Sequence, residues 1–253
     1  MQLRPLPALQ DNYVWLLADD AGRALAVDPG EAAPVLAAAE GLDLVAVLLT
    51  HHHPDHIAGT ADLLRRWPGA VVFAPEDGRI PEPCCRVADR ERIEAGPWAF
   101  EVIAVPGHTR SHVAYHGHDL LFCGDTLFSL GCGRLFEGTP AQMHASLSRL
   151  AALPADTRVC CGHEYTEANA RFALAVEPGN RDLLRHAEHV RDLRAQGRPS
   201  LPSSIAVERA CNPFLRVDEA GIRASIERQL GHAAHDSIEA FAALRAWKDE
   251  FRG

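Results

Sequence analysis

Short apolar runs alternate with turn-forming residues through the first two thirds of the chain. Runs of about four to eight apolar residues bounded by Gly, Pro, Asn and Asp are typical of β-strands. Eight strands are predicted in this way, at residues 13–18, 23–27, 45–49, 70–74, 98–105, 112–116, 120–123 and 158–161. Helical periodicity interrupts them at about residues 31–40, 57–67 and 140–152. The alternation of strands with helices predicts an α/β domain.

The last third of the chain shows the helical period almost throughout. Helices are predicted at roughly residues 164–176, 180–196, 218–230 and 236–251. The second of them carries one apolar stripe, formed by Leu183, Leu184, Ala187, Val190 and Leu193. Gly197 and Pro199 end that helix, and residues 197–216, which contain three prolines, are predicted as a loop. We therefore expect an α/β domain at 1–163 and a helical domain at 164–253.

The composition is that of an ordinary globular protein. The chain has 253 residues, of which 47% are hydrophobic and 23% are charged, which excludes disordered, fibrous and coiled-coil proteins. No apolar run approaches the ~18 residues that are needed to cross a bilayer. The first residues also lack the apolar segment of an export signal. We therefore expect a cytoplasmic protein that has no membrane association.

Charge and cysteine usage narrow the function further. The formal net charge is −9, from 34 acidic and 25 basic residues, so nucleic acid is a poor partner because phosphate binding needs a basic face. Lys248 is the only lysine in the sequence. The seven cysteines include two adjacent pairs, which have neither the spacing of a zinc knuckle nor that of a redox motif. We expect most of them to be buried as small apolar side chains.

A histidine motif follows the third predicted strand and is the strongest signal in the sequence. Residues 51–56 read H-H-H-P-D-H and supply the pattern H-x-H-x-D-H. In an extended chain, residues two apart point to the same face, so His51 and His53 can bind one ion together. Asp55 and His56 come where the chain turns into the next helix and point elsewhere. Although Asp55 could simply cap that helix, the complete motif favours a site for two metal ions.

Three later strands end in a glycine followed by a potential ligand. Taken singly, each such pair would indicate only a turn, but together with the histidine motif they complete a ligand set of five histidines and two aspartates. One ion would be held by His51, His53 and His108, and the other by Asp55, His56 and His163. Asp125 would bridge the two ions. Imidazole and carboxylate ligands suit zinc, which we expect, and also iron or manganese. His112 is expected to support a ligand.

The sequence resembles the metallo-β-lactamase superfamily and, within it, the glyoxalase II family. The motifs that carry the resemblance are L-P-A-L-Q-D-N-Y-V-W at 6–15, G-D-T-L-F-S-L-G-C-G-R-L-F-E-G-T at 124–139, C-G-H-E-Y-T at 161–166, N-P-F at 212–214 and R-A-W-K-D at 245–249. The resemblance implies an αββα sandwich followed by a C-terminal α-helical domain that holds glutathione. It further implies hydrolysis of S-D-lactoylglutathione to D-lactate and glutathione, with two divalent metal ions and with Asp55 and Asp125 as catalytic residues.

The resemblance also implies the substrate contacts, which are Arg134, Phe136, Tyr165, Asn169, Arg245 and Lys248. Arg245 and Lys248 match the basic pair that meets the glycine carboxylate of glutathione. Arg134 stands where relatives often carry lysine, so its positive charge is kept with a different geometry. Phe136 stands where many relatives carry tyrosine, so one hydroxyl contact is missing. Without the resemblance, the basic pair would be interpreted as solvated cations of an amphipathic helix.

Other functions fit parts of the same pattern. A persulfide dioxygenase of this fold would use one iron and also a glutathione-derived substrate, but it would usually lack the long helical tail. A lactonase or β-lactamase would leave the basic pair without a purpose, and the acidic balance opposes a tRNA-processing nuclease. A non-catalytic metal-binding module would not need complete ligand sets with space for water. The expected partner is therefore a small glutathione thioester, and we expect the chain to act as a monomer.

Overall fold

A computed structural model describes residues 1–252, which form two compact units that interleave along the chain. Unit 1 comprises Met1–Val105, Ser111–Gly124 and Cys160–Glu164. Unit 2 comprises Pro106–Arg110, Asp125–Val159 and the chain from Tyr165 onward. No helix within residues 1–252 is long and apolar enough to cross a membrane.

Unit 1 begins with a mixed sheet, in which the strands lie side by side in the same order as in the sequence. Its six strands among the described residues are β1 (Gln2–Ala8), β2 (Asn12–Ala18), β3 (Arg23–Val27), β4 (Asp43–Leu48), β5 (Val71–Pro75) and β6 (Cys85–Val87). The pairs β1–β2 and β2–β3 are antiparallel, whereas β3 to β6 pair in parallel. Parallel neighbours need crossover segments, and the first two crossovers contain the helices α1 (Ala33–Ala38), α2 (Pro54–Ile57) and α3 (Thr60–Arg66).

Both faces of this sheet are covered, as strand β2 shows. All seven of its residues are buried. Because side chains alternate along a strand, Val14 and Leu16 reach the apolar cluster that contains Leu63 of α3. Trp15 points the other way, and its indole N–H donates a hydrogen bond to the Cys161 carbonyl at 2.9 Å. The strand therefore packs against helices on one face and against a second sheet on the other.

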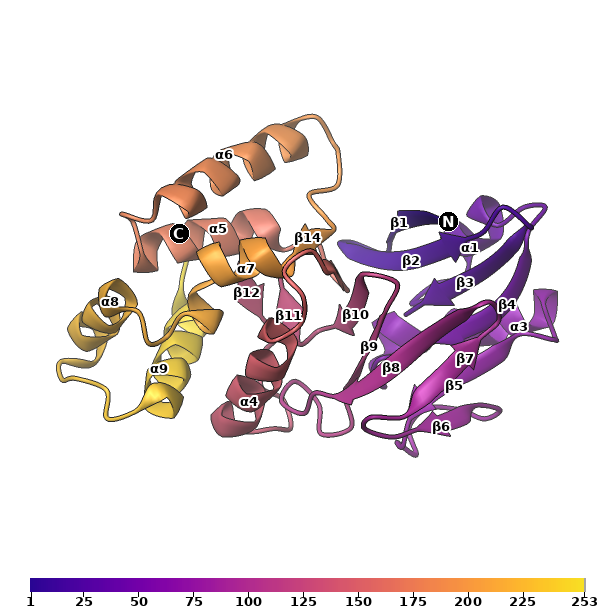
Figure 1. Cartoon of the computed structure of the whole chain (residues 1–253), viewed down its shortest axis with the longest axis horizontal. Coiled ribbons are helices and arrows are strands. Elements are labelled where there is room, and N and C mark those ends of the chain that lie inside the picture. Colours follow the sequence, from indigo (N-terminus) through magenta and orange to yellow (C-terminus); the bar gives the residue numbers. More distant parts are fainter. Residues whose placement is uncertain (253) are drawn as a thin grey trace. The chain divides into compact units, whose positions relative to one another are not determined.

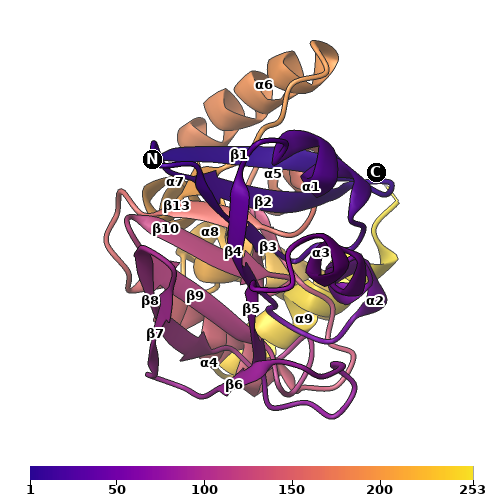
Figure 2. The same ribbon diagram turned by 90° about the vertical axis from the view of Figure 1, so that its right-hand side faces the viewer.

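The second sheet of unit 1 is antiparallel in its main part. It contains β7 (Arg92–Ala95), β8 (Trp98–Ala104), β9 (Val113–Gly117) and β10 (Leu120–Gly124), followed by the carboxyl half of β13 (Arg158–Cys161). Figure 2 shows β8, β9 and β10 side by side. Tyr115 of β9 is fully buried, and its hydroxyl donates to the Leu49 carbonyl of the first sheet at 2.9 Å.

Unit 2 is mainly helical. Its helices are α4 (Pro140–Ala151), α5 (Thr166–Val176), α6 (Arg181–Ala195), α7 (Ile205–Cys211), α8 (Ala220–Leu230) and α9 (Ser237–Glu250), with a 3₁₀ turn at Pro213–Leu215. Helix α5 packs against α6, and α9 packs against α4 and α8 (Figure 1). A short hairpin is formed by β11 (Leu127–Phe128) and β12 (Gly131–Cys132), and β14 (Ser203–Ser204) pairs with the amino half of β13.

The structure confirms the eight predicted strands and adds β1, β6, β7, β11 and β12, which the sequence did not predict. It confirms the predicted helices with two corrections. Residues 57–67 do not form one helix, because the helical turn begins earlier, at Pro54, and α2 and α3 are separate elements. The predicted loop at 197–216 is wrong in its second half, which contains β14, α7 and the 3₁₀ turn. Helix α7 begins where the Ser204 hydroxyl accepts a hydrogen bond from the Val207 backbone N–H at 3.3 Å.

Helix α7 brings a buried carboxyl group against the β11–β12 hairpin. Glu208 is fully buried and accepts hydrogen bonds from the Leu130 N–H at 2.8 Å and from the Asn212 amide at 3.0 Å. It also hydrogen-bonds the Ser203 hydroxyl. Burial raises the pKa of Glu208, and these hydrogen bonds oppose the rise. Leu130 has a φ of 58°, a left-handed conformation that a leucine rarely adopts, so the Glu208 carboxyl stabilises a strained turn.

Replacement of Glu208 by alanine is therefore expected to destabilise the protein. It leaves the Leu130 N–H and the Asn212 amide without this acceptor in a buried place, which costs about 1–3 kcal/mol. The measurement is the free energy of unfolding in urea, with Glu188→Ala on the exposed face of α6 as the matched control. Equal stability of the two variants would contradict the anchoring role.

Candidate metal centre and substrate pocket

The histidine motif begins three residues after the end of β4 and continues into α2. His51 is fully buried, and His53 lies in extended backbone as the N-cap of α2. Asp55 and His56 then lie within the single turn of α2, whose first residue is Pro54. From the sequence these two residues are expected just before a helix, whereas in the structure they lie inside one. Their side chains are thus directed by helical rather than extended geometry.

Within unit 1, one predicted ligand trio converges. The Nε2 atoms of His56 and His163 are 3.3 Å apart. The Asp55 Oδ2 atom lies 3.4 Å from the first of these nitrogens and 3.5 Å from the second. These three residues meet the geometry of a group that could hold a metal ion.

The opposite nitrogen of each of these two rings is held by a buried or half-buried carboxylate. His56 Nδ1 lies 3.0 Å from Asp28 Oδ2, and His163 Nδ1 lies 2.7 Å from Asp11 Oδ1. Since a carboxylate can only accept, both Nδ1 atoms carry the hydrogen and donate it. The Nε2 lone pairs are then left facing one another and the Asp55 oxygen. Two imidazole nitrogens and a carboxylate oxygen are ligands that suit a divalent cation, so the residues present fit a metal ion.

Asp55 is ionised in this arrangement. The neighbouring His163 and then His56 hold the pKa of the Asp55 carboxyl well below its usual range. Asn12 is a hydrogen-bond donor to this carboxylate, because its amide nitrogen lies 3.0 Å from Asp55 Oδ2 and 3.2 Å from the Asp55 backbone carbonyl. The carboxylate is therefore fixed in direction as well as in charge.

The second predicted pair of unit 1 is also close. His51 Nε2 lies 3.0 Å from His53 Nδ1. The Thr50 hydroxyl donates to Asp28 at 2.7 Å, so it accepts from His51 Nδ1, which lies 3.0 Å away. As in the first trio, one nitrogen of the His51 ring is held by a hydrogen bond, here to Thr50, and the other nitrogen faces a second candidate ligand, His53. His112, expected beside a ligand, stacks on the His51 ring with centroids 4.6 Å apart.

Asp28 is a functional residue that the sequence analysis missed. It is buried, and it accepts hydrogen bonds from the Thr50 N–H, the Thr50 hydroxyl and His56 Nδ1. It therefore orients two segments of the motif at once. The only local signal is the tripeptide Asp-Pro-Gly at 28–30 after a predicted strand, which by itself indicates a turn. Gly30 of that turn lies against the metal motif, because a Cβ there would stand 1.9 Å from the Asp55 carbonyl oxygen.

Unit 2 brings the two remaining predicted ligands together. His108 Nε2 lies 3.4 Å from Asp125 Oδ2. The Arg134 backbone carbonyl accepts from His108 Nδ1 at 2.9 Å, which again leaves Nε2 for the facing ligand. Gly133 permits this approach, since a Cβ there would stand 1.9 Å from the Asp125 carbonyl oxygen and 3.2 Å from His108 Nδ1.

His108 and Asp125 also line a cavity of unit 2, which has a volume of about 480 Å³. Every residue that the resemblance implied as a substrate contact lines this cavity, together with both ligands, namely His108, Asp125, Arg134, Phe136, Tyr165, Asn169, Arg245 and Lys248. Phe136 lies at its rim with 64% of its surface exposed. The Asn169 amide donates to the Ser129 carbonyl at 3.0 Å, so this side chain also holds the β11–β12 hairpin.

The cavity is electropositive at the end formed by α9. Arg245 is buried, and it donates to the Cys132 carbonyl at 2.9 Å and to Asp249 at 3.0 Å. Lys248 lies one helical turn later. Burial lowers the pKa of Lys248, and the positive charges of Arg245, Arg171 and Arg134 lower it further. Several cations are therefore concentrated at one place of a chain whose net charge is −9.

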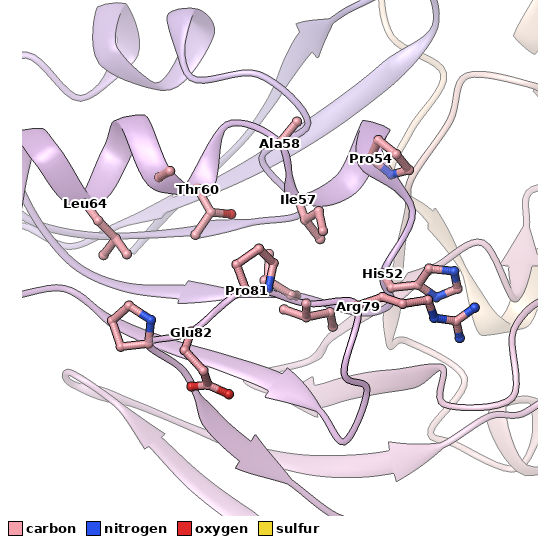
Figure 3. A pocket seen from close by; sticks show the side chains of 13 residues that line it. His52, Pro54, Ile57, Ala58, Thr60, Leu64, Arg79, Pro81 and Glu82 are labelled. Atoms are coloured by element: carbon pink, nitrogen blue, oxygen red, sulfur yellow. The ribbon is translucent and has the colours of Figure 1, made fainter.

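Unit 1 has a cavity of similar size, about 460 Å³, beside the metal motif (Figure 3). Its lining is mostly apolar and comes from α2, α3 and residues 79–83. His52 and Arg79 lie together at one end in the close view, away from Leu64. None of the predicted substrate contacts lines it. Of these two cavities, the one in unit 2 therefore has more basic side chains in its lining.

Comparisons with known proteins agree with this geometry. A family model described as Metallo-beta-lactamase superfamily matches residues 9–163, and one described as Hydroxyacylglutathione hydrolase C-terminus matches residues 164–251. A hydroxyacylglutathione hydrolase of Xanthomonas axonopodis pv. citri (strain 306) is 54% identical over 254 residues, which is 100% of both chains.

Solved structures share the fold. ETHE1 from Myxococcus xanthus superimposes with a TM-score of 0.64 and 28% identity, over 98% of this chain and 100% of that one. TTHA1623 in a di-iron-bound form has a TM-score of 0.60 and 25% identity, over 85% of this chain and 100% of the other. The predicted metallo-β-lactamase fold with a helical C-terminal region is thus confirmed.

Replacement of Asp28 by asparagine tests whether buried carboxylates orient the ligands. The amide keeps the shape but replaces one acceptor oxygen by a donor, so His56 loses its partner. Metal affinity is expected to fall by about 10–100-fold, as measured by competition with a coloured chelator. Asp20→Asn, at an exposed turn, is the matched control. Wild-type affinity in the Asp28 variant would show that this contact does not support the site.

Proposed function

Because the chain belongs to the hydroxyacylglutathione hydrolases of the metallo-β-lactamase superfamily, we propose that it hydrolyses S-D-lactoylglutathione to D-lactate and glutathione with two divalent metal ions. The observation that carries the proposal is the cavity of unit 2, in which two candidate metal ligands and the cationic cluster line one space. A thioester whose remote carboxylate meets the cations would present its acyl group to the metal ligands. A persulfide dioxygenase is not favoured, since the identity to a hydroxyacylglutathione hydrolase is 54% over the full chain.

We assign seven residues to the two ions. His51, His53 and His108 would hold one ion. Asp55, His56 and His163 would hold the other, and Asp125 would bridge them. Zinc is the expected metal, and iron or manganese would suit the same ligands. When bound, two such ions lower the pKa of a water towards ~7 and polarise a carbonyl oxygen.

The side chains of the site orient the reacting groups. Asp55, whose carboxylate is fixed by the Asn12 amide, would accept a hydrogen bond from the attacking water and direct its lone pair at the thioester carbon. The leaving group is a thiolate, whose conjugate acid has a pKa near ~8.5. It departs without a strong general acid, which agrees with the lack of a candidate for that role in the sequence.

Binding of the glutathione part supplies the positioning. Arg245, Lys248 and Arg134 would attract the glycine carboxylate, and Tyr165 and Asn169 would contact the peptide. Remote binding of this kind holds the acyl carbon in place for attack. The residues up to 163 would supply all seven metal ligands, and those from 164 to 253 would hold most of the glutathione. We also propose that the protein acts as a monomer in the cytoplasm.

Metal content and thioester hydrolysis should be measured on one purified sample. Two metal atoms per chain and turnover of S-D-lactoylglutathione are expected for the wild type. Asp125→Ala should lose most turnover and part of its metal, because it removes the proposed bridge. Full activity with full metal content in that variant would contradict the bridging role, and a wild type that leaves the thioester intact would contradict the function.

The lowered pKa of Lys248 predicts a pH dependence of substrate binding. The amine loses its charge at a pH below its ordinary pKa of about 10.4, so KM for the thioester should rise as the pH is raised through that range. Lys248→Arg keeps the charge, because a guanidinium does not deprotonate in proteins, and its KM should stay flat. The same rise in both proteins would assign the effect to another group.

A further inference from the structure

We propose that Asp249 competes with the substrate for the cations that bind the glycine carboxylate, and that it thereby sets the affinity of the pocket for a carboxylate. The inference rests on the proposed function, because it concerns the same subsite. Asp249 follows Lys248 near the end of α9, and no role for it follows from the proposed mechanism. Its place among the cations carries the argument.

The carboxylate of Asp249 joins two of the cations. Its Oδ1 atom lies 3.0 Å from Arg245 Nη2 and 3.5 Å from Arg134 Nε. The Asp249 side chain is 44% exposed, so it can rotate into water when another anion takes its place. Arg245, by contrast, is 7% exposed and remains fixed through its bond to the Cys132 carbonyl. The mobile partner of this pair is therefore the acid and not the base.

The cations Arg134, Arg245 and Lys248 form a cluster that attracts an anion. Arg245 Nε is buried and has no hydrogen-bond partner among the described residues, and the side chain lines the cavity. Among the largest charge effects on the pKa of Lys248, three arginines lower it and Asp249 raises it. Asp249 therefore supplies, from within the chain, the negative charge that a substrate carboxylate would supply.

Two carboxylates at one cluster repel each other, so the binding of the substrate must displace Asp249 or tolerate its charge. In both cases, Asp249 already neutralises part of the positive charge of Arg134 and Arg245 before the substrate binds. The opposite interpretation is that Asp249 orients Arg245 for the substrate. The two differ in sign: loss of the Asp249 charge tightens carboxylate binding if Asp249 competes, and weakens or leaves it unchanged if Asp249 only orients.

The test uses Asp249→Asn in the metal-loaded enzyme, because asparagine keeps an acceptor oxygen for Arg245 and removes the charge. Glu250→Gln is the matched control, since it removes the same charge one residue later from a side chain that makes no ion pair with these cations in the described structure. The probes are S-methylglutathione, which cannot be hydrolysed, and its glycine amide, which lacks the carboxylate. Dissociation constants are measured by calorimetry at low salt.

Asp249→Asn should bind S-methylglutathione about threefold more tightly than the wild type, a factor typical of one partly exposed charge pair. The glycine amide should show no such gain, and Glu250→Gln should bind both probes like the wild type. KM for the thioester should fall with kcat unchanged. The gain should also shrink at high salt, because exposed charges are screened.

Weaker or unchanged binding of S-methylglutathione by Asp249→Asn would overturn the proposal, as would an equal gain for the amide. An equal gain in Glu250→Gln would show an effect of net charge alone and would also overturn it. These outcomes leave the proposed function untouched when the wild type hydrolyses the thioester. A wild type that neither hydrolyses the thioester nor binds S-methylglutathione would instead refute the proposed function.

Discussion

Electron-rich atoms that face one another at about hydrogen-bonding distance are the constraint on which the site depends. In unit 1, two imidazole nitrogens and a carboxylate oxygen meet within 3.5 Å. Asp11 and Asp28 accept hydrogen bonds from the Nδ1–H groups of His163 and His56, so the Nε2 atoms of both rings present lone pairs. Such a cluster is stable only around positive charge. The buried Asp28, with its left-handed backbone, costs folding stability, and its hydrogen bond to His56 Nδ1 gives it a role in orienting a candidate metal ligand.

The substrate pocket depends on a different polar network. Glu208 and Asn212 hold the β11–β12 hairpin, and Cys132 at the end of that hairpin holds Arg245 through its carbonyl. Asp125 and Arg134 stand just before and just after the hairpin in the chain. The buried carboxyl of Glu208 on α7 thus fixes the segment that joins a candidate metal ligand to the cations. This connection explains why a fully buried carboxyl group, which is costly by itself, is present in unit 2.

The sequence predicted the central strands and the long helices because their apolar periods are strong. It failed where local signals oppose the structure. Strand β1 carries Pro5 and Pro7, which a strand tolerates only at an edge, and α7 is a short helix that follows a proline-containing segment. The H-x-H-x-D-H motif and the glycines before later ligands identified the candidate ligands. Asp28 escaped notice because its partners are distant in sequence. Asp11 and Asp249 lie within the motifs at 6–15 and 245–249, but no role was predicted for them because their contacts with His163 and Arg134 arise only in the folded chain.

The most direct test of the two-ion site is anomalous diffraction at the zinc edge from crystals of the zinc-loaded protein. Two peaks about 3.5–4 Å apart are expected, one surrounded by His51, His53 and His108 and the other by Asp55, His56 and His163, with Asp125 between them. A single peak, or two peaks that leave Asp125 and His108 unligated, would contradict it.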